Sequence, residues 1–223
     1  MSHDPTILAA CTEKGGAGKT TMITSLAVEY IARGFTVLMV DLDPQKSAAK
    51  WAAMGKREGQ TVPALLMPGL DDFKGPILNA APDFDRILVD APGRHGRVIS
   101  GVLAIADIFV MPTIPGRKDI WATRATHKIA LGVQAKRPEL QVKAMLSKVD
   151  RRRALSKTIR GTLVGLGIEV LASELTMLAD FDECTEEGQG PTTYNPKGKA
   201  ARDVRNLCDE LETLRAGAVA HAS

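Results

Sequence analysis

Short runs of apolar residues recur along the chain, and most of them lack the alternation with polar residues that marks a half-exposed strand. A strand that is apolar on both sides is buried on both faces, as in a parallel sheet covered by helices above and below. The runs with this pattern are residues 7–11, 37–40, 87–89, 108–111 and 142–146. The sequence therefore predicts an α/β, doubly wound domain with a mostly parallel sheet and helices on both faces.

The segments between these runs carry apolar residues at helical spacing. In the first segment, Met22, Ile23, Leu26 and Tyr30 fall near a period of 3.6 residues, and Gly34 is placed to end the helix. Similar patterns predict helices over residues 20–33, 47–54, 119–135, 154–166 and 200–214. Strands that alternate with helices in this way are typical of βαβ units.

The length of 223 residues, 44% of them hydrophobic, suits one compact domain. We expect a single domain over residues 1–215 and a flexible tail over 216–223. The longest apolar runs have five or six residues, whereas a membrane-spanning helix needs roughly 20. The first five residues do not resemble a secretion signal, and the three cysteines are far apart. These features predict a cytoplasmic protein without disulfides or a structural zinc.

A glycine-rich segment follows the first apolar run and precedes the first predicted helix. Backbone N–H groups in such a loop, with the positive end of the helix dipole, bind phosphate oxygens. By the mechanics of the motif, Lys19 contacts the β- and γ-phosphates, the Thr20 hydroxyl binds Mg²⁺ and Thr21 lies near the α-phosphate. The predicted nucleotide-binding residues are Lys14, Gly15, Gly16, Ala17, Gly18, Lys19, Thr20 and Thr21. The expected ligands are ATP and Mg²⁺.

One position departs from the ordinary phosphate-loop pattern. Glu13 stands where that pattern has its first glycine, and a second lysine, Lys14, follows it. This arrangement resembles the deviant Walker A motif of the ParA/MinD family of P-loop ATPases, in particular short ParA-type members without an N-terminal DNA-binding domain. The resemblance extends over residues 7–214 and weakens in the last third. It implies a weak Mg²⁺-dependent ATPase that forms an ATP-dependent homodimer, in which Lys14 reaches the ATP of the partner subunit.

Two aspartates follow the second apolar run, at the end of a strand where a doubly wound sheet binds its ligand. Asp43 stands directly before Pro44 and two residues after Asp41. The segment resembles the first switch of the family, which implies that Asp43 positions the attacking water and that Asp41 supports the Mg²⁺ site. The catalytic residues are then Lys14, Lys19 and Asp43. The alternative is a pair of carboxylates in a solvated turn.

A third aspartate, Asp90, ends the apolar run over residues 87–89 and resembles a Walker B residue that holds a Mg²⁺-bound water. The expected metal-binding residues, partly through water, are Thr20, Asp41 and Asp90. His95, close behind, is interpreted as an ordinary loop residue rather than a contact for an activating partner.

Farther along the chain, two interpretations of Asp119 stay open: a residue at a dimer interface and the cap of a helix. Trp51 and Trp121 are expected to be packing residues.

Basic residues are concentrated in two parts of the last third of the chain. In a dimer they would form a surface for non-specific DNA, with binding that weakens steeply as salt is added. The candidate DNA-binding residues are Arg151, Arg152, Arg153, Lys157, Arg160, Lys197, Lys199, Arg202 and Arg205. The alternative is a solvated helix face. No helix-turn-helix is evident, so sequence-specific operator binding is not expected.

The favoured function is that of a ParA-type positioning ATPase, nucleoid-associated, which moves a plasmid, a chromosome region or another large cargo with a ParB-like or other adaptor that stimulates hydrolysis. The alternative is a membrane-cycling ATPase like MinD, but residues 215–223 lack the bulky apolar and basic side chains of a membrane-binding helix, so no membrane partner is expected. A third class, an iron–sulfur reductase relative, would need a suitable cysteine pair, for which Cys11, Cys184 and Cys208 are poorly placed.

Overall fold

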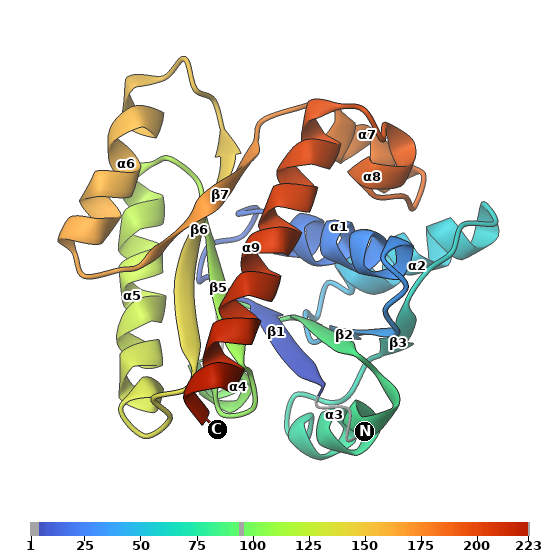
Figure 1. Cartoon of the computed structure of the whole chain (residues 1–223), viewed down its shortest axis with the longest axis horizontal. Coiled ribbons are helices and arrows are strands. Elements are labelled where there is room, and N and C mark those ends of the chain that lie inside the picture. The colour runs from blue at the N-terminus through green and yellow to red at the C-terminus, as the bar shows by residue number, and fades with distance from the viewer. Residues whose placement is uncertain (1–4, 94–95, 223) are drawn as a thin grey trace.

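One seven-stranded sheet, parallel at every paired strand, organises the chain (Figure 1). The computed structural model describes residues 5–93 and 96–222, with side chains described as far as residue 217. The strands are β1 (Thr6–Ala10), β2 (Val37–Asp41), β3 (Ala64–Leu66), β4 (Arg86–Asp90), β5 (Ile108–Thr113), β6 (Gln141–Val149) and β7 (Val170–Thr176), in the order β3-β2-β4-β1-β5-β6-β7. The predicted doubly wound fold is confirmed.

Helices cover both faces of this sheet. Successive strand residues point to opposite faces, so that Ile7 and Ala9 join one apolar cluster while Leu8 and Ala10 join the other. One face carries α3 (Lys74–Ala80) with the short 3₁₀ turn Ala81–Asp83, α4 (Gly96–Leu103), α5 (Arg117–Gln134) and α6 (Ala154–Gly165). The other carries α1 (Lys19–Ala32), α2 (Ser47–Arg57), α7 (Asp180–Glu186), α8 (Pro191–Tyr194) and α9 (Lys199–Ala222). Burial on two faces explains the continuous apolar runs of the inner strands.

The carboxyl ends of β1, β2 and β4 meet at one edge of the sheet. In the strand register, Ala10 and Asp41 are both partners of Asp90. The chain leaves β1 at this edge and enters α1 directly after the glycine-rich loop. Because β1 lies between β4 and β5, next to where the strand order reverses, the edge is the expected ligand crevice of a doubly wound sheet.

Two edge strands and several short helices are absent from the predicted elements. β3 has only three residues, and β7 carries the partly exposed Ser173 and Glu174. An edge strand has a neighbour on one side only and therefore lacks the long apolar run that marks an inner strand. At the C-terminus, α9 continues to Ala222 through the segment expected to be a tail, because residues 215–222 are rich in alanine, the strongest helix former. No helix in the described residues is long and apolar enough to cross a membrane.

Candidate nucleotide site

The glycine-rich loop between β1 and α1 requires glycine at two positions. Gly16 has a φ of 75° and Gly18 a φ of 90°, in the left-handed region that residues with a side chain rarely adopt. A Cβ atom on Gly18 would also lie 2.5 Å from Ser147 Oγ at the end of β6. The first turn of α1 contains no acidic residue, so the positive end of its dipole is available to an anion.

Lys19 and Thr20 begin α1 beside Asp90 at the end of β4. Lys19 is buried, and Thr20 Oγ1 donates a 2.6 Å hydrogen bond to Asp90 Oδ2. The other oxygen, Asp90 Oδ1, is buried without a hydrogen-bond partner in the part of the chain that the structure describes. Such an oxygen, beside a hydroxyl, fits Mg²⁺, a hard cation that prefers oxygen ligands.

Burial raises the pKa of Asp90 to about 7; the hydrogen bond from Thr20 and the charge of Lys19 lower this pKa, and the charge of Asp41 raises it further. In the unfolded chain the pKa is near 3.8. Between about pH 4 and 7, the folded chain therefore binds more protons at Asp90 than the unfolded chain does, and the contribution of Asp90 to stability falls as the pH rises.

We expect this contribution to fall by up to about 1.4 kcal/mol per pH unit. Substitution of Asp90 by asparagine should remove this pH dependence. Urea unfolding of wild type and Asp90→Asn, without Mg²⁺ and at several pH values between about 4 and 7, would measure the difference. The same pH slope in wild type and Asp90→Asn would contradict the assigned pKa.

Asp41 shapes the segment that follows β2. Its Oδ1 accepts a hydrogen bond from the Asp43 backbone N–H at 3.0 Å, and its Oδ2 accepts one from the Ala49 N–H at 2.9 Å. Burial raises the pKa of Asp41, while these two backbone hydrogen bonds lower it. Asp43, which is half-buried, accepts a hydrogen bond from the Gln45 N–H through Oδ1 at 2.9 Å. The two carboxylates thus hold the turn between β2 and α2, with Asp43 the more exposed.

The second lysine of the loop contacts its own chain. Lys14 Nζ donates to both Oδ1 and Oδ2 of Asp119, each at 2.7 Å, although the two residues are 105 positions apart. Asp119 is buried in the first turn of α5, and Gly116 is the N-cap residue of that helix. The helix-cap interpretation of Asp119 is therefore wrong, because Gly116 occupies the N-cap position, no side chain caps the helix, and the Asp119 carboxylate pairs with Lys14 instead.

The segment after β4 packs closely against the base of the loop. The Cys11 thiol donates to the Pro92 carbonyl at 3.6 Å, and a Cβ atom on Gly93 would collide with the Thr12 carbonyl oxygen. Gly93 is thus required by a close backbone approach. His95 lies outside the described residues.

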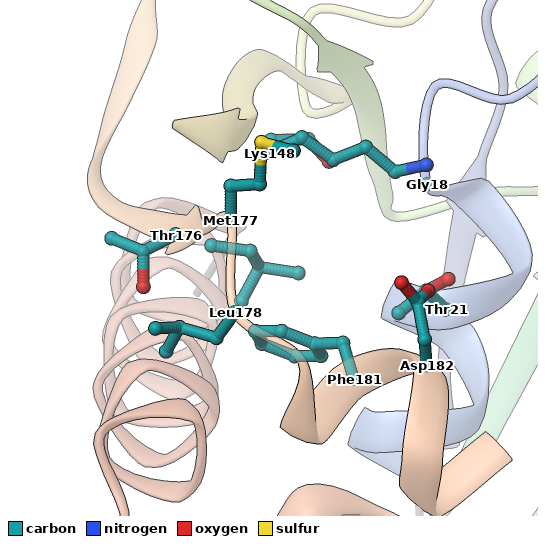
Figure 2. Close-up of a pocket in the computed structure, with 10 residues that line it drawn as sticks. Gly18, Thr21, Lys148, Thr176, Met177, Leu178, Phe181 and Asp182 are labelled. Atoms are coloured by element: carbon teal, nitrogen blue, oxygen red, sulfur yellow. The ribbon is translucent and has the colours of Figure 1, made fainter. Parts of the chain in front are cut away.

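A pocket lies beside the loop, between the ends of β6 and β7 (Figure 2). Gly18 and Thr21 border it on one side, and Lys148, Met177 and Phe181 on the other. Lys148 has a φ of 52°, a conformation that residues other than glycine seldom adopt and that often marks functional sites. Its side chain extends across the pocket toward Gly18 in Figure 2.

The pocket measures about 100 Å³, below the roughly 300 Å³ at which small-molecule sites begin. Entry of a nucleotide base would therefore require Lys148 and Met177, both exposed, to move. No sequence motif marks Lys148 or Met177; the one signal was that the apolar run over 142–146 ends two residues before Lys148.

The candidate DNA-binding residues near α6 are mostly paired within the chain. Arg151 and Arg160 both contact Glu174, and Arg152 contacts Asp150. In the described structure, the members of this group that are exposed without a side-chain ion pair are Arg153 and Lys157.

The candidates near the start of α9 divide in the same way. Lys199 donates to Thr176 Oγ1 at 2.7 Å and lies 3.4 Å from Asp203 Oδ2, and Arg205 donates to the Pro196 carbonyl at 2.8 Å. Lys197 and Arg202 are exposed, and neither has an ion pair in the part of the chain that the structure describes. Fewer positive charges are therefore free for a phosphate backbone than the sequence suggests.

A phosphate loop between the first strand and first helix of a doubly wound sheet, with an aspartate at the end of the neighbouring strand, defines a P-loop nucleotide-binding protein. Residues 8–192 match the family described as the CobQ/CobB/MinD/ParA nucleotide binding domain. The chain belongs to this family, and it is a ParA/MinD-type ATPase. The resemblance inferred from Lys14 and the loop is thereby confirmed.

Several relatives match almost end to end. Maintenance of carboxysome distribution protein A of Halothiobacillus neapolitanus is 29% identical over 204 residues, which cover 89% of this chain and 92% of the relative. Chromosome-partitioning ATPase Soj of Thermus thermophilus is 26% identical, with 92% and 94% covered.

Solved structures share the fold. The ATP complex of a Cyanothece McdA variant has a TM-score of 0.74 at 13% identity, with 95% of this chain and 98% of that chain covered. The cell division ATPase MinD of Pyrococcus furiosus has a TM-score of 0.70 at 20% identity, with 96% and 100% covered.

Proposed function

We propose that the chain is an ATP-dependent dimerising switch that binds non-specific DNA, positions a large cargo and hydrolyses ATP when a cargo adaptor stimulates it. The observation that carries the proposal is the second lysine of the loop. One lysine suffices for the phosphates of an ordinary P-loop, and Lys19 is buried at the start of α1 for that purpose. Lys14 is partly exposed at the start of the same loop. A cation in that position is suited to phosphates bound by a second subunit.

The ion pair of Lys14 with Asp119 supports a switch. To reach a nucleotide on a partner, Lys14 must leave Asp119 and exchange two carboxylate oxygens for phosphate oxygens. Breaking the pair without replacement would leave the buried carboxylate of Asp119 without its cation, which is destabilising. The exchange therefore becomes favourable only when a partner presents a nucleotide, which links dimer formation to ATP.

Within one subunit, each proposed role follows from position. The loop amides and Lys19 bind the phosphates, and Thr20 with Asp90 would hold Mg²⁺, whose contribution is to neutralise charge on the phosphates. Asp43, which follows β2 and is more exposed than Asp41, orients the attacking water. Asp41 keeps the turn around Asp43 in place through the Asp43 and Ala49 amides.

The relatives' names indicate large cargoes, carboxysomes in one case and chromosomes in another. We infer that this chain likewise carries a protein compartment, a plasmid or a chromosome region over the nucleoid. The exposed and unpaired Arg153, Lys157, Lys197 and Arg202 would supply the phosphate contacts, and a dimer would double them.

Substitution of Lys14 by glutamine tests the proposal. In gel shifts with duplex DNA of arbitrary sequence, wild type should bind more tightly with ATP than without it, and Lys14→Gln should bind equally weakly in both conditions. Lys56→Gln, which removes an exposed lysine on α2, is the matched control and should behave as wild type. Equally tight DNA binding by the wild type with and without ATP would refute the proposal.

A membrane-cycling ATPase is the second candidate, because α9 extends as a helix to Ala222. The residues of its last two turns are mostly alanine, and an interfacial helix needs bulky apolar and basic side chains. Liposome co-sedimentation that requires ATP would favour this candidate over DNA binding.

A further inference from the structure

One face of α5 combines positive charge with exposed apolar side chains. Residues spaced alternately by four and three positions fall on the same side of a helix. On α5 this series is Arg117, Trp121, Arg124, Lys128 and Leu131, all of them exposed. Trp121, expected from the sequence to be a packing residue, is 68% exposed, whereas Trp51 is buried and donates to the Gln189 carbonyl. The expectation was wrong for Trp121 because this face of α5 points away from the sheet.

The exposed apolar residues of the molecule concentrate at this place. Of the seven large apolar side chains that the described residues leave exposed, four lie on α5 or at the C-terminal end of α6: Trp121, Leu131, Val164 and Leu166. A groove of about 540 Å³ is bordered by Trp121, Leu131 and Leu166. Leu166 directly follows α6, so the groove lies between α5 and the C-terminal end of α6. Exposed apolar groups that cluster in one groove mark an interaction site, whereas single ones are ordinary.

The rim of the groove is positively charged. Arg124 and Lys128 line it, and neither has an ion pair among the described residues. The only acidic residue of α5, Asp119, is buried against Lys14. The nearby Glu169 pairs with Lys143. A partner with carboxylates would therefore find two cations on α5, between Trp121 and Leu131, that have no ion pair among the described residues.

We propose that the α5–α6 groove is a docking site for an acidic amphipathic helix of a partner protein. Apolar side chains of that helix would pack between Trp121, Leu131 and Leu166, while its carboxylates would pair with Arg124 and Lys128. In this mode of recognition the apolar face of a helix packs into an apolar groove, and no exposed strand edge is required. The proposal goes beyond the function given above because it requires neither ATP nor DNA.

Two other occupants fit the groove less well. A DNA backbone would satisfy the cations but would leave the apolar floor uncovered. Among the described helices of a second copy, α7 is the acidic one, but Phe181 and Cys184 on its apolar side are already buried in the core of their own subunit. An acidic helix with a free apolar face therefore has to come from another protein.

The chain has two tryptophans, so the Trp51→Phe variant makes Trp121 the sole fluorescent reporter. The probe is a synthetic helical peptide with the same length as α5, 18 residues, which carries leucines on one face and glutamates elsewhere. We expect saturable binding without nucleotide and a blue shift of Trp121 emission. The double substitution Arg124→Glu and Lys128→Glu should weaken binding at least about tenfold. The matched control, Lys50→Glu with Lys56→Glu on α2, should bind as wild type does.

Folding of each variant would be checked by circular dichroism, and Leu131→Asp provides a second test of the groove that leaves both cations in place. Equal binding of a probe with lysines in place of the glutamates would overturn the proposal. So would an unchanged affinity of the Arg124→Glu and Lys128→Glu variant, or no binding up to about 1 mM peptide. A Trp121 shift produced by duplex DNA, or by raising the protein concentration alone, would assign the groove to those occupants instead and would equally overturn it.

Discussion

Replacement of Asp43 by alanine is expected to lower the turnover of ATP by about 100-fold or more while ATP binding is retained. A positioned carboxylate that orients or deprotonates a nucleophile typically contributes a factor of about 10² to 10⁴. Asp43 is the half-buried carboxylate two residues after the end of β2, and it is near enough to Asp90 for its charge to raise the pKa of Asp90. In the proposed function hydrolysis ends the dimeric state, so Asp43→Ala should also stay dimeric in ATP. Phosphate release and size-exclusion chromatography would measure the two effects.

A second variant separates this role from a structural one. Asp43 also accepts a hydrogen bond from the Gln45 N–H, which Asp43→Asn can preserve and Asp43→Ala cannot. If the charge orients the water, both variants lose turnover to a similar extent. Wild-type turnover in Asp43→Asn together with loss in Asp43→Ala would mean that Asp43 acts only by holding the turn.

Substitution of Gly18 by alanine is expected to destabilise the fold and to weaken ATP binding together. At a φ of 90°, a residue with a side chain is strained by about 1 to 3 kcal/mol. The added Cβ would also lie 2.5 Å from Ser147 Oγ, so that the loop or the Ser147 side chain must shift. We expect the free energy of unfolding to fall by about 1 to 3 kcal/mol. The displaced loop amides should weaken ATP binding at least about tenfold.

Gly15→Ala is the matched control for the effect on stability. A Cβ atom on Gly15 would meet no atom within 4 Å, and Gly15 does not have a positive φ. Urea unfolding should therefore leave Gly15→Ala close to wild type. Equal stability of Gly18→Ala and wild type would show that the loop tolerates a side chain at Gly18 and that its backbone is less constrained than the geometry indicates.

The fold class followed from the sequence because it depends on local patterns. Continuous apolar runs such as residues 37–40 and 87–89 cannot belong to half-exposed strands, and amphipathic segments between them supply the covering helices. The glycine-rich loop was predictable for the same reason, since all of its residues are neighbours in sequence. Edge strand β7 was missed because its partly exposed Ser173 and Glu174 interrupt the apolar pattern.

The partners of charged residues could not be predicted. The sequence marked Lys14 as unusual and left two interpretations of Asp119, and only the structure brings these residues, 105 positions apart, into one ion pair. Likewise, the count of basic residues did not indicate that Arg151 and Arg160 share Glu174.

The sequence by itself thus determined the fold class, the five inner strands, the loop and the strand ends at which the aspartates stand, because hydrophobic periodicity and motif spacing act over a few residues. The tertiary structure decided which cations remain free, where the pocket beside Gly18 opens and which face of α5 is left uncovered. These properties depend on distances between segments that are far apart along the chain, and those distances exist only once the sheet has assembled.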